Sequence, residues 1–162
     1  MARKRQIERV KMKVNIKKLS PTAKIPTKGT YASAGYDLYA DIRSDDDDIG
    51  VVTIYPHQTL MIPTGISVEI PNGYFGGIFA RSGLSTKKGL NLANGVGCID
   101  SDYRGEVIVA LHNDSNVQQE FSNHDRIAQL VIIPYLDVEF EEVDKVSKTN
   151  RGEGGFGSTG KE

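Results

Sequence analysis

Apolar and polar residues alternate over short runs along most of the chain, which is the pattern of half-buried β-strands. Between residues 11 and 19, Met12, Val14 and Ile16 face one way with lysines between them. Later runs of the same kind are VVTIYP, TLMIP and GISVEIP between residues 51 and 71, YFGGIFAR at 74–81, VIVAL at 107–111 and NHDRIAQLVIIP at 123–134. Residues 137–147 suggest a last, acidic strand. Short strands at this spacing predict a β-sandwich or barrel.

One stretch departs from the strand pattern. The sequence RSGLSTKKGL at 81–90 predicts a single helical turn, with Ser82 as the N-cap and Gly89 closing the helix. Arg81 stands directly before the cap, and free backbone N–H groups beside an arginine favour an anion such as phosphate. The plainer alternative is a simple capped turn. Since no long segment repeats apolar residues at helical spacing, the fold class is all-β.

The segment NGVGCIDSDYRGE at 94–106 reads as a β-hairpin, with two β-prone runs separated by turn residues. It carries more chemistry than a turn needs, because Asp100, Asp102, Tyr103, Arg104 and Glu106 fall within seven residues. Glycines beside them would let a ligand approach the backbone closely. A solvated hairpin tip is the alternative, because turns normally collect Asp, Ser and Gly.

Bulk properties restrict the class of protein. A chain of 162 residues suits one domain with a real core, and a net charge of −1 does not steer it toward nucleic acid. Cys98 is the single cysteine, so no intrachain disulfide forms and a reducing compartment is expected. No apolar run is long enough to span a bilayer. These features predict an intracellular protein.

Both ends of the chain differ from the middle. Residues 1–10 are mostly basic and lack a packing pattern, so we expect a solvated arm. The tail RGEGGFGSTGKE has G-x-G-x-x-G spacing, but no βαβ unit follows, which excludes a dinucleotide site of that type. Two interpretations remain: a disordered tail, or a glycine-rich arm that folds over a nucleotide and orders only with ligand. Gln129, amid apolar residues, needs hydrogen-bond partners if it is buried.

Five short motifs, taken together, resemble the trimeric dUTPase family. They are AGYDLYA at 34–40, ARSGLSTKKGL at 80–90, NGVGCIDSDYRGE at 94–106, DRIAQLVIIP at 125–134 and RGEGGFGSTG at 151–160. The motifs cover about a third of the chain, in the family's order and spacing. The resemblance implies a jelly-roll-like β-sandwich over residues 11–148, with one short helix, a basic arm at 1–10 and a flexible lid arm at 149–162. It also implies a homotrimer whose active sites are shared between subunits.

The resemblance further implies hydrolysis of dUTP to dUMP and pyrophosphate with Mg²⁺, in the cytoplasm or, in a eukaryotic or viral setting, the nucleus. Asp100 would be the general base that activates water at the α-phosphorus. Asp37 would act on the metal through metal-bound water. Tyr103 would pack on the deoxyribose and exclude a 2′-hydroxyl. The remaining substrate-binding residues would be Asn94, Gly97 and Ile99 at the uracil, Arg81, Ser82, Gly83 and Gln129 at the phosphates, and Arg151, Phe156, Gly157, Ser158 and Thr159 in the arm.

Two alternatives stay open on the sequence. A dCTP deaminase-like enzyme would share the fold and the grip on the triphosphate, but the Asp-Ser-Asp-Tyr-Arg-Gly pattern at 100–105 favours the diphosphatase. A non-catalytic trimeric binding or regulatory module would also keep the fold. A lost Asp100 or a truncated tail would have indicated it, and neither is seen. The acidic run Asp45–Asp48 and the basic first ten residues receive no function from the motifs.

Overall fold

The computed structural model of the chain describes residues 12–42 and 50–155. These residues form eleven strands and one helix, so the predicted all-β class is confirmed. The elements in order are β1 (Asn15–Lys18), β2 (Tyr36–Tyr39), β3 (Val51–Ile54), β4 (Thr59–Pro63), β5 (Ile66–Glu69), β6 (Tyr74–Phe79), α1 (Ser82–Lys88), β7 (Leu90–Leu92), β8 (Gly97–Ile99), β9 (Ile108–Asn113), β10 (Gln119–Ser122) and β11 (Arg126–Pro134).

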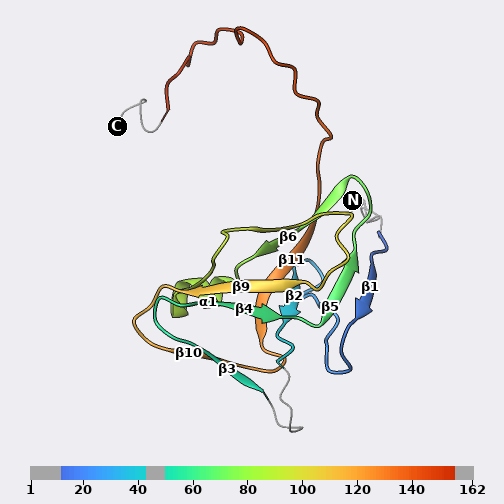
Figure 1. The fold of residues 1–162 in the computed structure, drawn as a ribbon, viewed down its shortest axis with the longest axis vertical. Coiled ribbons are helices and arrows are strands. Elements are labelled where there is room, and N and C mark those ends of the chain that lie inside the picture. Colours follow the sequence, from blue (N-terminus) through green and yellow to red (C-terminus); the bar gives the residue numbers. More distant parts are fainter. Residues whose placement is uncertain (1–11, 43–49, 156–162) are drawn as a thin grey trace, which may run out of the picture.

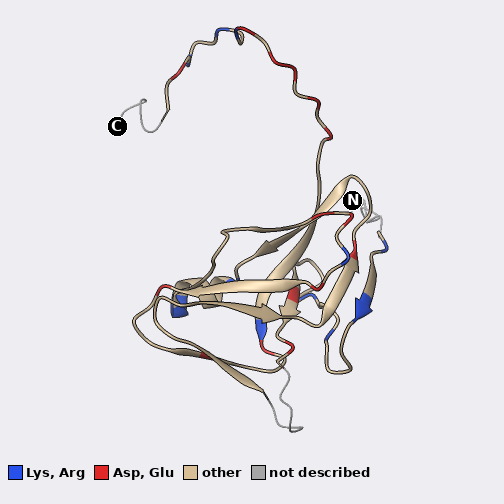
Figure 2. Cartoon of the chain, viewed as in Figure 1, with Lys and Arg blue, Asp and Glu red and all other residues tan. Residues whose placement is uncertain are grey.

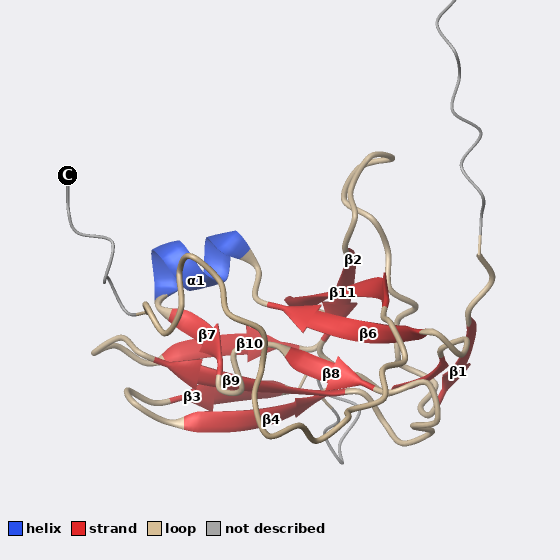
Figure 3. Cartoon of the chain, turned by 90° about the horizontal axis from the view of Figure 1, so that it is seen from above, coloured by secondary structure: helices blue, strands red, loops and turns tan. Residues whose placement is uncertain are grey.

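The strands form a jelly-roll-like sandwich of small antiparallel sheets (Figure 1). The largest sheet has the order β2-β11-β6-β8, a second has the order β4-β9-β7, and two pairs, β1-β5 and β10-β3, complete the fold. Figure 3 shows the strands in layers, with α1 at one end beside β7. A core of buried aliphatic residues joins the sheets, including Leu38, Ile54, Ile66, Leu111 and Ile127.

Strand β11 holds the large sheet together, since it pairs with β2 on one side and with β6 on the other. Its pairing with β2 contains a β-bulge, because Arg126 opposes Tyr39 while Ala128 opposes Leu38, which leaves Ile127 as an extra residue. A bulge of this kind changes the face on which the preceding side chain lies. Arg126 therefore lies on the same face as Gln129, although strict alternation would place them on opposite faces.

Two sequence predictions about local structure are wrong. Residues 94–106 are not a paired hairpin, because β8 pairs with β6 whereas β9 pairs with β4 and β7. The segment instead crosses from one sheet to the other. Residues 137–147 form no strand; they belong to an irregular arm, residues 135–155, that leaves the end of β11 and runs away from the sandwich (Figure 1). Without a partner strand, apolar and acidic residues in alternation do not make a strand.

Helix α1 is present, but its start differs from the prediction. The N-cap is Arg81, with extended backbone angles, and no side chain caps the helix. Ser82 is the first helical residue. Gly89 closes the helix in the left-handed conformation, as predicted, with φ of 65°. No helix in the described parts of the chain is long and apolar enough to cross a membrane.

Candidate active site

The predicted site residues fall into two groups at opposite edges of the large sheet. One group surrounds Asp37 in β2, and the other follows β8. Three strand spacings separate these edges, which is about 14 Å across the sheet, and the pairing register offsets Asp37 from Ile99 by about 10 Å along the strands. Within one chain the two groups therefore do not meet.

The first group, which we call the Asp37 cluster, consists of Asp37, Arg81, Arg126 and Gln129. The Asp37 side chain is only 6% exposed, and its Oδ1 lies 3.2 Å from Arg81 Nε. Its Oδ2 lies 3.2 Å from Arg126 Nη1. Gln129 Nε2 donates to Oδ1 over a longer distance of 3.5 Å. The cluster carries two guanidinium charges and one carboxylate, so a net positive charge remains for an anion.

Arg81 is fixed on two sides. Its Nη1 donates to the backbone carbonyl of Arg126 at 3.0 Å. Its Nε is buried and has no hydrogen bond of good geometry, although it lies within ion-pair distance of Asp37. The ion pair with Asp37 holds Arg81 Nε in place, since charge attraction tolerates poor alignment better than a hydrogen bond does. Ser82 and Gly83 follow Arg81 on the exposed first turn of α1.

Sequence reasoning missed one member of the cluster. Arg126 is part of the DRIAQLVIIP motif but receives no role from the sequence. Strict alternation along a strand would place it on the face opposite Gln129. The bulge at Ile127 reverses that arrangement. Nothing in the sequence marks a bulge, so no local signal could have found this residue.

The second group, at residues 94–106, surrounds a small cavity of ≈ 80 Å³ between the two sheets. Predicted residues Asn94, Gly97 and Ile99 line it, together with Ile78 of β6 and Ala110 of β9. Among the described residues, β8 is the last strand of its sheet, and no strand of residues 12–42 or 50–155 pairs with its outer edge. Such an edge presents backbone N–H and C=O groups to a planar, polar ligand.

Asp100 and Tyr103 follow β8 in the exposed turn. The Tyr103 N–H donates to the Asp100 carbonyl at 3.2 Å, and the Tyr103 hydroxyl donates to the Glu106 carbonyl at 3.0 Å. A Cβ at Gly105 would overlap the hydroxyl and ring of Tyr103, so glycine is needed for the ring to lie there. Glu106 in turn accepts a hydrogen bond from the Gly65 N–H at 2.7 Å, which ties the turn to the core.

Cys98 lies beside the predicted base. Its thiol is exposed, and Sγ lies 3.7 Å from Asp100 Oδ1. Partial burial raises the pKa of the Cys98 thiol, and the neighbouring Asp100 carboxylate raises it further through its charge and the hydrogen bond. The thiol is therefore neutral at physiological pH and is a poor nucleophile.

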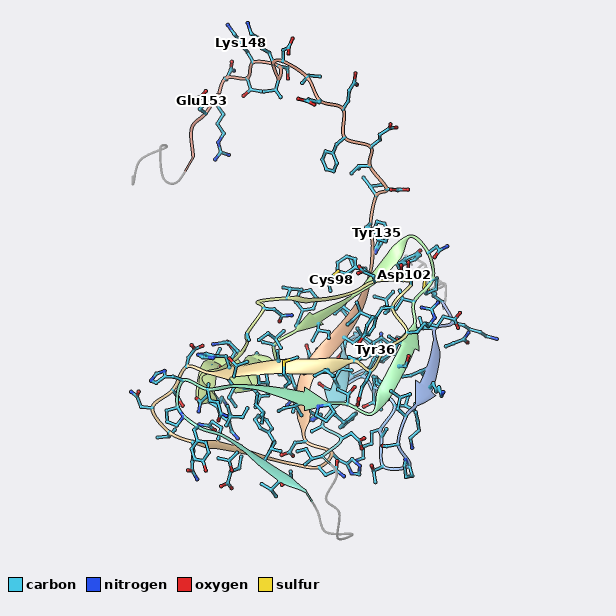
Figure 4. All side chains as sticks on the ribbon, viewed as in Figure 1. Tyr36, Cys98, Asp102, Tyr135, Lys148 and Glu153 are labelled. Carbon is cyan, nitrogen blue, oxygen red and sulfur yellow. The ribbon has the colours of Figure 1, made fainter. Side chains whose placement is uncertain are left out.

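The predicted residues of the tail are only partly described. Arg151 lies in the arm, where its Nε donates to the Gly154 carbonyl at 2.8 Å. Figure 4 shows Tyr135 close to the sandwich, with Lys148 and Glu153 far from it. Acidic residues are spread along the arm (Figure 2). Phe156, Gly157, Ser158 and Thr159 lie outside the described residues, as do the basic residues 1–10 and the Asp45–Asp48 run.

These features define an all-β protein with a small cavity at one edge of the large sheet, here called the slot, and a cationic cluster at the other edge. Comparison with known proteins is consistent with this class. The family model for dUTPase matches residues 21–160. The chain belongs to the dUTPase family.

Individual relatives agree over nearly the whole length. The chain is 47% identical over 150 residues to the deoxyuridine 5'-triphosphate nucleotidohydrolase of Nautilia profundicola, covering 93% of this chain and 100% of that protein. It is 44% identical over 152 residues to that of Desulfitobacterium hafniense, covering 93% and 97%. Among solved structures, a mutant dUTPase of Staphylococcus bacteriophage 80alpha with dUpNHpp has a TM-score of 0.80 at 28% identity, covering 91% of this chain and 98% of that chain.

Proposed function

We propose that the protein is a dUTP diphosphatase that hydrolyses dUTP to dUMP and pyrophosphate. Family membership and identities near 44% over most of the chain carry this assignment. The described site residues support it, because the slot and a carboxylate lie in one segment while a cationic cluster suits a triphosphate. The enzyme would remove dUTP from the nucleotide pool and supply the precursor of dTTP.

In this mechanism the uracil edge pairs with the free backbone edge of β8 and with Asn94. A fixed set of donors and acceptors rejects cytosine, since the wrong exocyclic group leaves buried groups unpaired. Tyr103 packs on the deoxyribose. Asp100 accepts a proton from water as the water oxygen bonds to the α-phosphorus, and the bond from that phosphorus to the bridging oxygen breaks. Pyrophosphate leaves with that oxygen, held by the Asp37 cluster.

Magnesium suits this site only as a substrate-held ion. Among the described residues, no group of three or more His, Cys, Asp and Glu side chains could form a protein cage. Both Asp37 oxygens already contact arginines, but each keeps lone-pair capacity for a water. Mg²⁺ normally keeps waters and binds substrate phosphates with one or two carboxylates, so Asp37 would reach it through water. When bound, the ion would screen the triphosphate charge.

We infer a homotrimer with shared sites, and the placement of the two groups supports a site built from more than one subunit. Because they lie at opposite sheet edges in one chain, a complete site needs the slot of one subunit beside the Asp37 cluster of another. The arm supports assembly as well: Leu136, Phe140 and Val146 are 84–94% exposed. An apolar groove of ≈ 660 Å³, lined by residues such as Val14, Ile16, Tyr36 and Ile132, offers matching surface on a neighbouring copy.

The reaction is tested with a panel of deoxynucleoside triphosphates and UTP, with and without Mg²⁺. We expect pyrophosphate release from dUTP alone, and little activity without the metal. Ammonia released from dCTP would instead identify a deaminase. A protein that binds dUTP but releases nothing would be the non-catalytic module.

Shared sites are tested by co-expressing Asp100→Asn and Arg81→Ala subunits with different tags and purifying the mixed assemblies. Each variant alone should be nearly inactive. If a site combines two neighbouring subunits, each mixed trimer regains one of its three sites, so the purified mixture restores about a third of the wild-type activity. Mixed assemblies no more active than the parents would place the whole site in one chain.

The arm is tested by deleting residues 151–162. We expect turnover to fall strongly while sedimentation still shows a trimer, because these residues would act as a lid over the site. Monomers after the deletion would make this part of the arm structural. The division of the chain at residues 11 and 149 and the cytoplasmic location stay predictions.

A further inference from the structure

Arg126 has the properties of a substrate-binding residue that the motifs did not assign. We propose that Arg126 binds the triphosphate directly, beside Arg81, and that Asp37 orients both guanidinium groups. This inference rests on the proposed function, because it concerns the same triphosphate.

The first observation is the direction of the side chain. The bulge at Ile127 places Arg126 on the same sheet face as Gln129, Asp37 and Tyr39. Bulges are common beside active sites, where they redirect a side chain. The alternative arrangement, with Ile127 on this face, would expose a side chain that is now fully buried. The strand therefore keeps its core contact and adds a cation to the polar face.

The second observation is unused hydrogen-bonding capacity. Arginine has five N–H donors in a planar fork. Among the described residues, the single partner of the Arg126 guanidinium is Asp37, through Nη1. The side chain is 50% exposed, so the remaining donors reach solvent. A guanidinium held at one corner by a carboxylate, with its other edge open, suits bidentate contact with a phosphate.

The third observation is charge. The Asp37 carboxylate lies between two arginines, and the fourth member of the cluster, Gln129, is neutral. If Arg126 served only to neutralise Asp37, Arg81 alone would already balance that charge. The second guanidinium leaves the cluster positive, as a polyanion such as a triphosphate requires.

The test is calorimetric binding of inorganic tripolyphosphate to Arg126→Met, Arg126→Lys and wild type, without turnover. Lys17→Met is the matched control, because it removes an exposed positive charge from β1. We expect Arg126→Met to bind tripolyphosphate roughly tenfold or more weakly, and the KM for dUTP to rise similarly. Arg126→Lys should recover part of the loss, and Lys17→Met should bind tripolyphosphate as the wild type does. The affinity of Arg126→Met for deoxyuridine, which has no phosphate, should stay near the wild-type value.

A purely structural role for Arg126 predicts a different pattern. In that case Arg126→Met would have no further effect on tripolyphosphate binding once Asp37→Asn is present, and this result would overturn the proposal. So would wild-type affinity in Arg126→Met. Thermal melting identifies variants that fail to fold. If Arg126→Met does not fold, the affinity of Arg126→Lys for tripolyphosphate is compared with that of the wild type, and equal affinity would overturn the proposal. Failure of the wild type to hydrolyse dUTP would count against the proposed function, while the calorimetry would still report on Arg126.

Discussion

The turn segment at 94–106 and the Asp37 cluster are both rich in charge, but they are held together in opposite ways. In the turn segment several contacts are local, since Arg104 Nη1 donates to the Ser101 carbonyl and the Tyr103 hydroxyl to the Glu106 carbonyl, each three residues away. Others, such as the hydrogen bond from the Gly65 N–H to Glu106, tie the segment to the core. In the Asp37 cluster the partners are 44 to 92 residues apart along the chain. The turn can therefore keep part of its shape through its own contacts, whereas the cluster exists only when the sheet is complete.

This difference predicts that changes in the turn alter chemistry more than stability. The largest expected effect is that of Asp100→Asn, which removes the proposed base while leaving the backbone contacts of the turn in place. We expect kcat for dUTP to fall by about 10²- to 10⁴-fold with little change in KM or melting temperature. The rate of pyrophosphate release from dUTP measures the change in kcat. Asp102→Asn, at a nearby exposed carboxylate, is the control. Equal activity of the wild type and Asp100→Asn would show that the base is assigned wrongly.

Changes in the cluster should alter stability as well as activity. Asp37→Asn leaves two arginines without their shared counter-charge, in a place where the carboxylate is nearly buried. Because Arg126 is half exposed, we expect a loss of about 2 kcal/mol rather than the full cost of breaking a buried pair. Melting should fall by roughly 4–8 °C.

The control for that melting experiment is Glu69→Gln. Its ion pair with Arg104 is 3.7 Å long and both side chains are 53% exposed, so solvent screens it strongly. We expect almost no change in melting temperature. If both variants melted alike, the cluster would be no more dependent on the sheet than a surface pair is.

The turn segment could be predicted from the sequence better than the Asp37 cluster, because its contacts join residues that are close together in the chain. Asp100, Tyr103 and the polar turn stood out because their residues are neighbours in the chain. The pairing of β8 was not predicted, since β8 and β9 look like hairpin partners until β6 and β4 compete for them. The contact between Asp37 and Arg126 depends on a bulge that alternation does not show. The prediction of Ser82 as the N-cap is wrong, because its neighbour Arg81 adopts the cap geometry without a side-chain hydrogen bond.

A smaller effect should follow from Gly105→Ala in the turn. The added Cβ would overlap the Tyr103 ring and push it from its position beside the proposed sugar site. We expect the ratio of kcat/KM for dUTP to that for UTP to fall by about fivefold, which is within the effect of a modest packing change. Gly83→Ala is a useful comparison for melting temperature, because a Cβ there meets nothing within 4 Å. Unchanged sugar selectivity in Gly105→Ala would argue against a role for Tyr103.

The smallest effect concerns the thiol beside the base. Partial burial and the Asp100 carboxylate keep the pKa of Cys98 above its ordinary value, so less thiolate is present at a given pH. Asp100→Asn removes the second of these causes and should lower that pKa. We expect alkylation of Cys98 by iodoacetamide at pH 8 to become about two- to threefold faster, as followed by mass spectrometry. Asp37→Asn should leave the rate unchanged, because Asp37 lies at the other sheet edge.

The extra residue in β11 also limits which insertions and deletions this strand can tolerate. Deleting Arg126 would turn Ile127 onto the polar face, whereas deleting Ile127 would leave Arg126 on that face but remove a fully buried side chain from the core. Substitutions along β11 can be absorbed one side chain at a time, but a change in its length cannot. We therefore expect related sequences to conserve the number of residues between Arg126 and Gln129 more strictly than the identities of those residues.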